Sequence, residues 1–226
     1  MIKHIVFDWD GTLADTYPTI TAAYNYVFKR MEMSEETLSI EKLKYITGTL
    51  QNKDTAGFIF GNRKDEALKF YYEYINNHHT DNLSSIPGAI DVLEFCKDHN
   101  IKCYLISNKT NKASGDKKAY LSKEVQKLGL EKYFEKIQGA GEADEDKPSL
   151  KATHALFNHS LPNPEEIFFL GDGSADYQIA KSYIKNGKSA KVIIYNPDNI
   201  YKGPQPDYMV VNMSSVIEII KKENNL

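Results

Sequence analysis

Cysteine is scarce in this sequence, because its 226 residues include only Cys96 and Cys103. Without a Cys-x-x-Cys pair, a zinc knuckle or a dithiol redox motif lacks its ligands, and we expect both thiols to be reduced and buried. The sequence has no run of about 20 apolar residues that could span a bilayer and no secretory signal pattern near its start. Positive charge is not in excess either, since 28 Lys and Arg face 31 Asp and Glu. These absences predict a soluble, cytoplasmic protein with no nucleic-acid or membrane partner.

Short apolar runs alternate with longer amphipathic stretches, which is the pattern of βα units around a parallel sheet. The predicted strands span residues 2–7, 101–106, 167–170, 191–195 and 208–211, with a weaker one at 136–139. The predicted helices span residues 89–99, 117–128, 149–159, 175–186 and 213–222. The fold class predicted is therefore α/β, with a Rossmann-like doubly wound parallel sheet.

Residues 17–83 interrupt this alternation, because they show helical periodicity and Tyr-rich stripes but no strand pattern. Helices are expected at residues 19–31, 40–46, 55–60 and 64–77, and a further one opens at Ser34. Two domains are thus predicted. Residues 1–16 and 84–226 form the Rossmann-like core, and residues 17–83 form an inserted all-helical domain over the strand ends.

Asp8 and Asp10 directly follow the first predicted strand, where an extended chain points both side chains to the same side. Two converging carboxylates can hold a hard cation such as Mg²⁺, and one of them can then act as a nucleophile. An Asp in a polar loop can also simply cap a helix. An EF-hand is excluded, because Thr12 and Leu13 stand where that loop needs Asp or Asn and then Gly.

Three further polar clusters lie at later junctions between strands and helices. Ser107 and Asn108 follow the second strand, and Lys147 lies just before a helix N-terminus, which favours an anion. Asp172 lies between two glycines at a strand end, with Asp176 four residues later. Taken singly, these features are also explained by turn residues, an exposed lysine and a helix-dipole acid.

Together the four clusters resemble the haloacid dehalogenase superfamily of phosphotransferases, and most closely its phosphoglycolate phosphatase-like subgroup. The resemblance rests on Asp8-Trp9-Asp10-Gly11-Thr12, Ser107, Lys147-Pro148 and Gly171-Asp172-Gly173-Ser174-Ala175-Asp176. It covers nearly the whole chain and equates residues 17–83 with the helical cap domain of that family.

The resemblance implies that Asp8 attacks phosphorus to form an aspartyl phosphate and that Asp10 is the general acid and base. It also implies a Mg²⁺ cofactor, held by Asp8, by the backbone carbonyl of Asp10 and by Asp172. Asp176 would support the metal site or orient the lysine.

The phosphoryl oxygens would then be bound by Ser107 and Lys147, helped by Thr12 and Asn108. These roles predict a Mg²⁺-dependent phosphatase acting on a small phosphorylated metabolite. A phosphomutase acting on a sugar phosphate would use the same residues, and a phospho-acceptor module or a catalytically silent scaffold remains an alternative. The motifs assign neither the substrate nor an oligomeric state.

Candidate substrate-reading residues in the cap are Thr49, Gln51, Asn52 and Lys53. Two other features are interpreted as structural. Residues 109–118 are expected to form a solvated, basic loop. A helix face and its polar end account for Tyr71, Tyr72 and Tyr74, and for His78 and His79.

Overall fold

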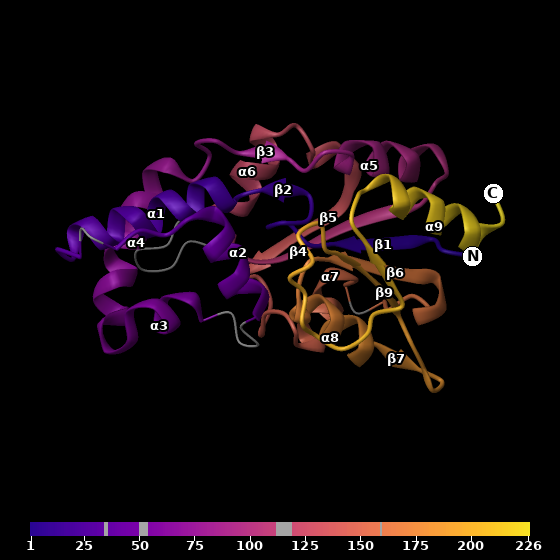
Figure 1. The fold of residues 1–226 in the computed structure, drawn as a ribbon. Helices are drawn as coiled ribbons and strands as arrows, with labels where there is room; N and C mark the ends of the chain where they lie inside the picture. Colours follow the sequence, from indigo (N-terminus) through magenta and orange to yellow (C-terminus); the bar gives the residue numbers. More distant parts are fainter. Residues whose placement is uncertain (34–35, 50–53, 112–118, 159) are drawn as a thin grey trace.

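A six-stranded parallel sheet forms the centre of the computed structural model, which describes residues 1–33, 36–49, 54–111, 119–158 and 160–226 (Figure 1). The strand order is β10-β9-β6-β1-β4-β5. The strands are β1 (His4–Phe7), β4 (Lys102–Thr110), β5 (Phe134–Ala140), β6 (Ile167–Gly171), β9 (Lys191–Tyr195) and β10 (Tyr208–Val210). The strands β4 and β5 lie on one side of β1, and the later strands β6, β9 and β10 lie on the other. The end of β1 is therefore the topological switch point, where such sheets bind ligands. The predicted doubly wound parallel sheet is confirmed.

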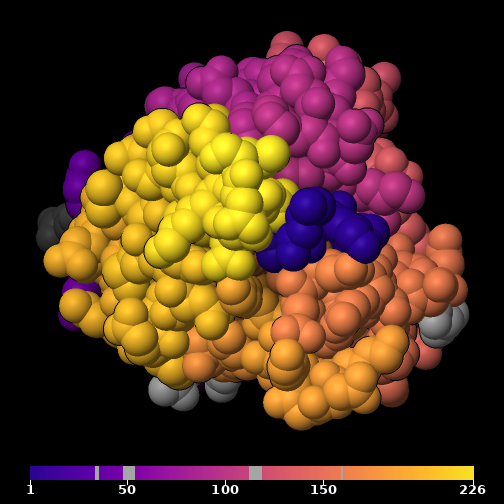
Figure 2. Space-filling view, turned by 90° about the vertical axis from the view of Figure 1, so that its right-hand side faces the viewer, coloured from indigo at the N-terminus to yellow at the C-terminus, as the bar shows by residue number. Residues whose placement is uncertain are grey.

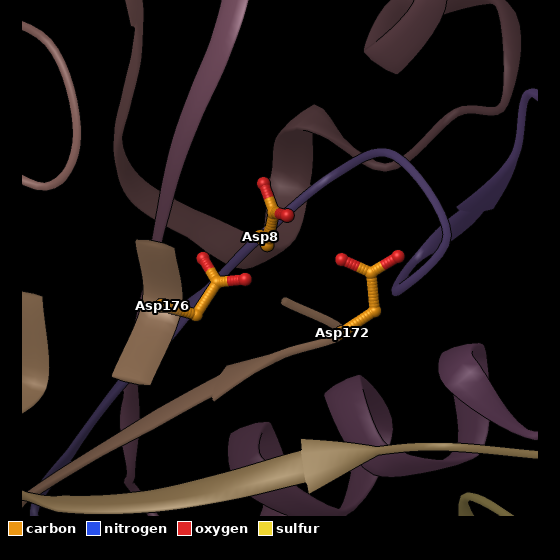
Figure 3. Close-up of side chains that lie close together, drawn as sticks. All are labelled: Asp8, Asp172 and Asp176. Carbon is orange, nitrogen blue, oxygen red and sulfur yellow. The ribbon is translucent and has the colours of Figure 1, made fainter. Parts of the chain in front are cut away.

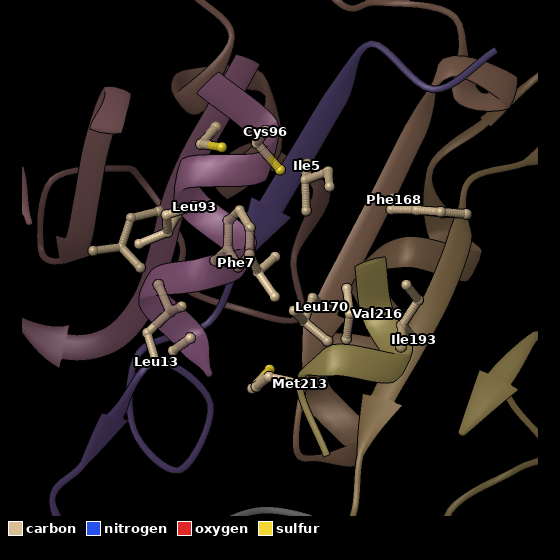
Figure 4. Close-up of a cluster of buried hydrophobic side chains, with 14 of the residues drawn as sticks. Ile5, Phe7, Leu13, Leu93, Cys96, Phe168, Leu170, Ile193, Met213 and Val216 are labelled. Carbon is tan, nitrogen blue, oxygen red and sulfur yellow. The ribbon is translucent and has the colours of Figure 1, made fainter. Parts of the chain in front are cut away.

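Helices cover both faces of this sheet, which explains why its central strands are almost continuously apolar. Ile5 and Phe7 point to the face covered by α5 and α9 (Figure 4). Val6 belongs to the second apolar cluster, with residues of α7 and α8. The helices of the core are α5 (Ala89–Asp98), α6 (Leu121–Lys127), α7 (Leu150–Leu156), α8 (Ser174–Ser182) and α9 (Ser214–Asn224), with 3₁₀ turns η2 (Glu131–Tyr133) and η3 (Pro164–Glu166). Burying each large apolar side chain stabilises the folded state by about 1.5–3 kcal/mol. The strand ends therefore belong to a tightly packed, stable core. Cys96 and Cys103 lie in this core as free, buried thiols, as predicted.

The two ends of the chain lie side by side on the surface, with the N-terminal residues in indigo beside the yellow C-terminal helix (Figure 2). The side chain of Asn224 donates a hydrogen bond to the carbonyl oxygen of Ile2 at 3.1 Å and accepts one from the Ile2 backbone N–H. This pair of bonds attaches α9 to the start of β1.

The inserted helices form a layer of their own beyond the strand ends (Figure 1). They are α1 (Tyr17–Arg30), α2 (Ile40–Thr49), α3 (Thr55–Phe60), the 3₁₀ turn η1 (Gly61–Arg63) and α4 (Lys64–His78). They share an apolar cluster that includes Val27, Phe28, Leu43 and Phe60. At their base β2 (Ala14–Asp15) pairs antiparallel with β3 (Ser84–Ser85), so the chain leaves and re-enters the core through adjacent strands. These features support the predicted division into core and cap, which stays a prediction.

The main error in the predicted elements concerns the helix expected at residues 175–186. α8 ends at Ser182, and the chain then forms a hairpin of β7 (Ile184–Lys185) and β8 (Lys188–Ser189). Asn186 and Gly187 both have positive φ, 54° and 76°, as a two-residue hairpin turn requires. The predicted helix ended at residue 186, although the Asn-Gly pair there is also the strongest short-range hairpin signal.

Other boundaries shift by a few residues. β4 continues to Thr110 instead of ending at residue 106, which brings Ser107 and Lys109 onto a strand. The predicted helix starts at residue 117 and at Ser34 lie outside the described residues, and α6 begins at Leu121. None of the helices in the described part of the chain is long and apolar enough to cross a membrane.

Candidate active site

Three aspartates meet where β1 and β6 end and α8 begins (Figure 3). Asp8 follows β1, Asp172 follows β6, and Asp176 lies in the first turn of α8. One carboxylate oxygen of each lies within 4.8 Å of those of the other two, a spacing that could hold a metal ion. The parallel sheet explains the meeting, because its strands end at the same edge.

Two glycines allow the carboxylates to come this close. Gly11 has φ of 75°, and a Cβ at this position would collide with the carboxylate of Asp172. A Cβ on Gly171 would collide with the side chain of Asp176. The backbone N–H of Gly173 donates a hydrogen bond to Oδ2 of Asp176 at 3.1 Å and fixes that carboxylate at the start of α8.

Lys147 provides the positive charge beside this cluster. Its Nζ lies 2.6 Å from Oδ1 of Asp8 and 2.7 Å from Oδ1 of Asp176, and all three side chains are at least 96% buried. Asn108 holds the backbone of Lys147: its Oδ1 accepts from the Lys147 N–H at 2.9 Å, and its Nδ2 donates to the Lys147 carbonyl at 3.0 Å. The Asn108 side chain, expected to help bind phosphate, thus contacts the residue that carries the ammonium group.

Asp10 faces a different lysine. Its Oδ1 accepts a hydrogen bond from Thr16 Oγ1 at 2.7 Å and lies 2.8 Å from Nζ of Lys109. The Asp10 side chain is not part of the three-carboxylate cluster found among the described residues. The resemblance had assigned its backbone carbonyl, not its carboxylate, to the metal.

Lys109 and Glu124, 14% and 1% exposed, form a second charge pair that the sequence did not predict. Nζ of Lys109 lies 2.7 Å from Oε2 of Glu124, which also accepts a hydrogen bond from Nε1 of Trp9 at 2.7 Å. Burial alone would lower the pKa of Lys109, but the carboxylates of Asp10 and Glu124 raise it, so the ammonium stays charged. The interpretation of residue 109 as part of a solvated loop is therefore wrong. Its partner Glu124 lies in α6, and no sequence pattern links the two.

Ser107 and Thr12 have different surroundings. Ser107 is buried, lines the cavity above the carboxylates, and accepts a hydrogen bond from the Lys109 N–H at 3.0 Å. Thr12 is fully buried and does not line that cavity. The structure therefore brings Ser107 to the carboxylates and leaves the Thr12 hydroxyl in the interior.

A cavity of about 390 Å³ lies between the core and the inserted helices. Its core side includes Asp8, Asp10, Ser107, Lys147 and Asp172, and its other side is formed by α1, α2, α4 and the start of α3. Tyr71, Tyr72 and His79 line it, so interpreting them as a plain helix face and its end missed their position. The spacing of Leu68, Tyr72 and Ile75 along one side of α4, continued by His79 just after its end, could have identified it.

The polar candidates in the cap have no described side chains: Thr49 belongs to α2 but its side chain is not described, and Gln51, Asn52 and Lys53 lie outside the described residues.

A smaller cavity of about 250 Å³ lies on another side of Asp172. Beside it, Nζ of Lys44 in α2 lies 2.7 Å from Oδ2 of Asp198, which follows β9. This ion pair connects the inserted helices to the core.

Comparison with known protein families gives a match over most of the chain. The sequence model described as haloacid dehalogenase-like hydrolase matches residues 5–185. The chain is 24% identical to a pyrophosphatase PpaX from Listeria monocytogenes, over 98% of both chains. It is 27% identical to phosphoglycolate phosphatase 1 from Pseudomonas aeruginosa, over 79% of this chain and 65% of that protein.

Solved structures show the same fold. A haloacid dehalogenase-like hydrolase from Streptococcus pneumoniae superposes with a TM-score of 0.76 at 20% identity, over 97% of this chain and 98% of that one. A predicted phosphoglycolate phosphatase from Haemophilus somnus gives a TM-score of 0.74 at 20% identity, with the same coverage.

Proposed function

The chain belongs to the haloacid dehalogenase-like hydrolases, as its four motifs predicted, and on that premise we propose that it is a Mg²⁺-dependent phosphatase of a small phosphorylated metabolite. The observation that supports this most strongly is the cluster of Asp8, Asp172 and Asp176, two of which contact Lys147, at the edge of a cavity large enough for a substrate. Phosphoryl transfer needs mainly charge neutralisation and positioning, and this arrangement provides both.

The donor atoms fit the proposed metal. The cluster offers only carboxylate oxygens, the hard ligands that Mg²⁺ takes, and they converge within 4.8 Å. Three carboxylates beside a single ammonium leave an excess of negative charge that a divalent cation would neutralise. Asp8, Asp172 and the backbone carbonyl of Asp10 would hold the ion, and Asp176 would support it. When bound, Mg²⁺ supplies positive charge that offsets the charge of the phosphoryl oxygens.

The reaction would use two aspartates in turn. A carboxylate oxygen of Asp8 attacks phosphorus, and the bond between phosphorus and the substrate oxygen breaks. Asp10 gives a proton to that oxygen, so the alcohol leaves neutral. Asp10 then takes a proton from a water molecule, which attacks the aspartyl phosphate and releases inorganic phosphate and the Asp8 carboxylate.

The neighbouring side chains hold these groups in place. Lys147 neutralises charge beside Asp8 and would also bind phosphoryl oxygens, with Ser107 as a second donor. Thr16 and Lys109 fix the Asp10 carboxylate through contacts of 2.7 and 2.8 Å. Orientation of this kind accounts for much of the rate enhancement in such reactions.

The test is phosphate release by the wild-type protein and by Asp8→Asn, with small phosphate esters, in Mg²⁺ and in EDTA. Wild type should release phosphate only with Mg²⁺, and Asp8→Asn should lose at least about 10³-fold of the rate. Exposed Asp98→Asn is the matched control and should keep full activity. Unchanged phosphate release in Asp8→Asn would rule out the assignment. Release of free phosphate, as opposed to its return to a sugar, also distinguishes a phosphatase from a phosphomutase.

A further inference from the structure

Among the described residues that line the cap side of the cavity, apolar and phenolic side chains outnumber the other polar ones. α1, α2 and α4 contribute Ile20, Leu43, Leu68, Tyr71, Tyr72 and Ile75. These residues face the carboxylates and Lys147 across the cavity, where the alcohol part of a bound phosphate ester would lie. The leaving group would therefore meet a surface that favours apolar contact.

The described lysines that line the cavity are already paired with carboxylates. Among the described lining residues there are three, and Lys147 and Lys109 each lie between two acids. The third, Lys64 on the cap side, has its Nζ 2.7 Å from Oδ2 of Asp54. The Lys64 pair is the weaker one, since its side chains are 39% and 50% exposed. A second anionic group on the substrate would compete with a carboxylate of the protein for each of these cations, and it would face a described lining in which acids outnumber lysines.

The phenol of Tyr71 adds a neutral polar contact to this wall. Burial raises its pKa well above the usual value, and Tyr24 and Asp10 raise it further, so the hydroxyl stays protonated. A protonated phenol can donate a hydrogen bond to a neutral oxygen or nitrogen, and its ring offers a face for apolar or aromatic contact.

The volume of the cavity also favours a large leaving group. About 390 Å³ is near the lower end of the range for pockets that enclose drug-sized ligands. A phosphoryl group together with a two-carbon acid or a second phosphate would leave much of the apolar cap side in contact with water. A leaving group that carries a ring would cover it.

We propose that the preferred substrate is a phosphomonoester of a neutral alcohol with an apolar or aromatic body, and not one whose leaving group carries a second negative charge. This inference rests on the proposed phosphatase function and specifies its substrate class. It separates this chain from the activities in the names of its relatives, since the leaving groups of pyrophosphate and phosphoglycolate are both anionic.

The test compares kcat/KM for benzyl phosphate and phosphoglycolate, two esters of primary alcohols that differ in the charge and apolarity of the leaving group. Pyrophosphate is the second anionic substrate, and acetyl phosphate, which is small and reactive, reports on the phosphoryl site alone. Benzyl phosphate should be preferred over phosphoglycolate by about tenfold or more. If phosphoglycolate or pyrophosphate is preferred, and Asp8→Asn abolishes phosphate release from it, the proposed substrate class is wrong and the phosphatase function stands. If none of the four substrates releases phosphate, both proposals fail.

A pair of variants at one cap position sharpens the result. Leu68→Lys places a new ammonium group on the cap wall and should shift the kcat/KM ratio at least severalfold toward phosphoglycolate, whereas Leu68→Met preserves size and apolarity and should leave the ratio near that of wild type. An equal shift in both variants would contradict the charge argument. If Leu68→Lys does not fold, as judged by circular dichroism, the wild-type ratio still decides.

Discussion

Two largely buried lysines flank the acid pair that follows β1, and each is held between two carboxylates. Lys147 lies between Asp8 and Asp176, and Lys109 lies between Asp10 and Glu124. In each case one acid comes from the end of β1 and the other from a helix, α8 or α6.

The two clusters differ in what surrounds them. The Lys147 cluster is almost fully buried and adjoins Asp172, whereas the Asp10 side chain is 32% exposed. Acids only two residues apart therefore have different environments. Asp8 is placed for attack within a dense group of charges, and Asp10 is placed for proton exchange at a more open position.

Of the two lysine variants, Lys147→Met should lose more activity, because it removes the cation of the more buried cluster. Asp8 and Asp176 would repel each other and the phosphoryl oxygens would lose a donor, so kcat should fall on the order of 10²- to 10³-fold. Steady-state phosphate release measures this. Lys151→Met is the control, since Lys151 is 59% exposed and pairs with Glu145 at the surface. A Lys147→Met enzyme as active as this control would show that the ammonium is dispensable.

Lys109→Met tests the second cluster in the same way. It leaves Glu124, which is 1% exposed, without its cation, and should cost about 3 kcal/mol of unfolding free energy. It also removes the contact between Lys109 and the Asp10 carboxylate that helps to position Asp10, which should lower kcat by about 10- to 100-fold. In Lys109→Met/Glu124→Gln the buried charge is removed too, so stability should recover in part while activity does not. Equal losses of stability in the single and double variants would contradict the pairing.

The pH dependence of the same variant follows from the raised pKa of Lys109. A lysine whose pKa is higher in the folded state contributes its full stability below the unfolded value of about 10.4 and loses it only as pH rises through the folded value. The stability difference between wild type and Lys109→Met should therefore be equal at pH 7 and pH 9. Urea denaturation at both pH values measures it, and a difference that disappears by pH 9 would show that the pKa is lowered instead.

Metal binding should distinguish the two clusters more clearly. If Mg²⁺ is held beside Asp8 and Asp172, saturating Mg²⁺ at about 100 times its Kd should stabilise wild type by about 2.7 kcal/mol. Asp172→Asn should lose most of this gain, while Glu124→Gln should keep it. Thermal unfolding with Mg²⁺ and with EDTA gives the values, and a gain that survives in Asp172→Asn would place the ion elsewhere.

The smallest effect is expected at the ion pair between cap and core. Lys44 and Asp198 are 27% and 46% exposed, so Lys44→Met should change stability by no more than about 1 kcal/mol. If the pair helps to hold the cap over the cavity, KM should rise a few-fold with little change in kcat. Lys188→Met removes an ion pair with Glu165 on the surface of the core domain, away from the cap, and should leave KM unchanged.

The sequence predicted the first cluster because each of its residues lies at a recognisable junction. Asp8 and Asp172 end apolar runs, and Lys147 and Asp176 lie at or near the start of helices, so parallel topology alone brings them together. Lys109 and Glu124 meet only because α6 packs beside β4, a tertiary contact without a local pattern. The residues that line the cap side of the cavity were not predicted as such for a related reason. The same face of α4 packs into the apolar cluster of the cap and lines the cavity, so its periodicity indicates only a buried helix face.

The most direct test of the nucleophile is chemical trapping during turnover. Borohydride added to the enzyme turning over a good substrate with Mg²⁺ would reduce an aspartyl phosphate to homoserine, which peptide mass spectrometry can locate. The proposed mechanism predicts homoserine at residue 8 and none in Asp8→Asn or without substrate. Homoserine at residue 10, or no modified residue during rapid phosphate release, would contradict it.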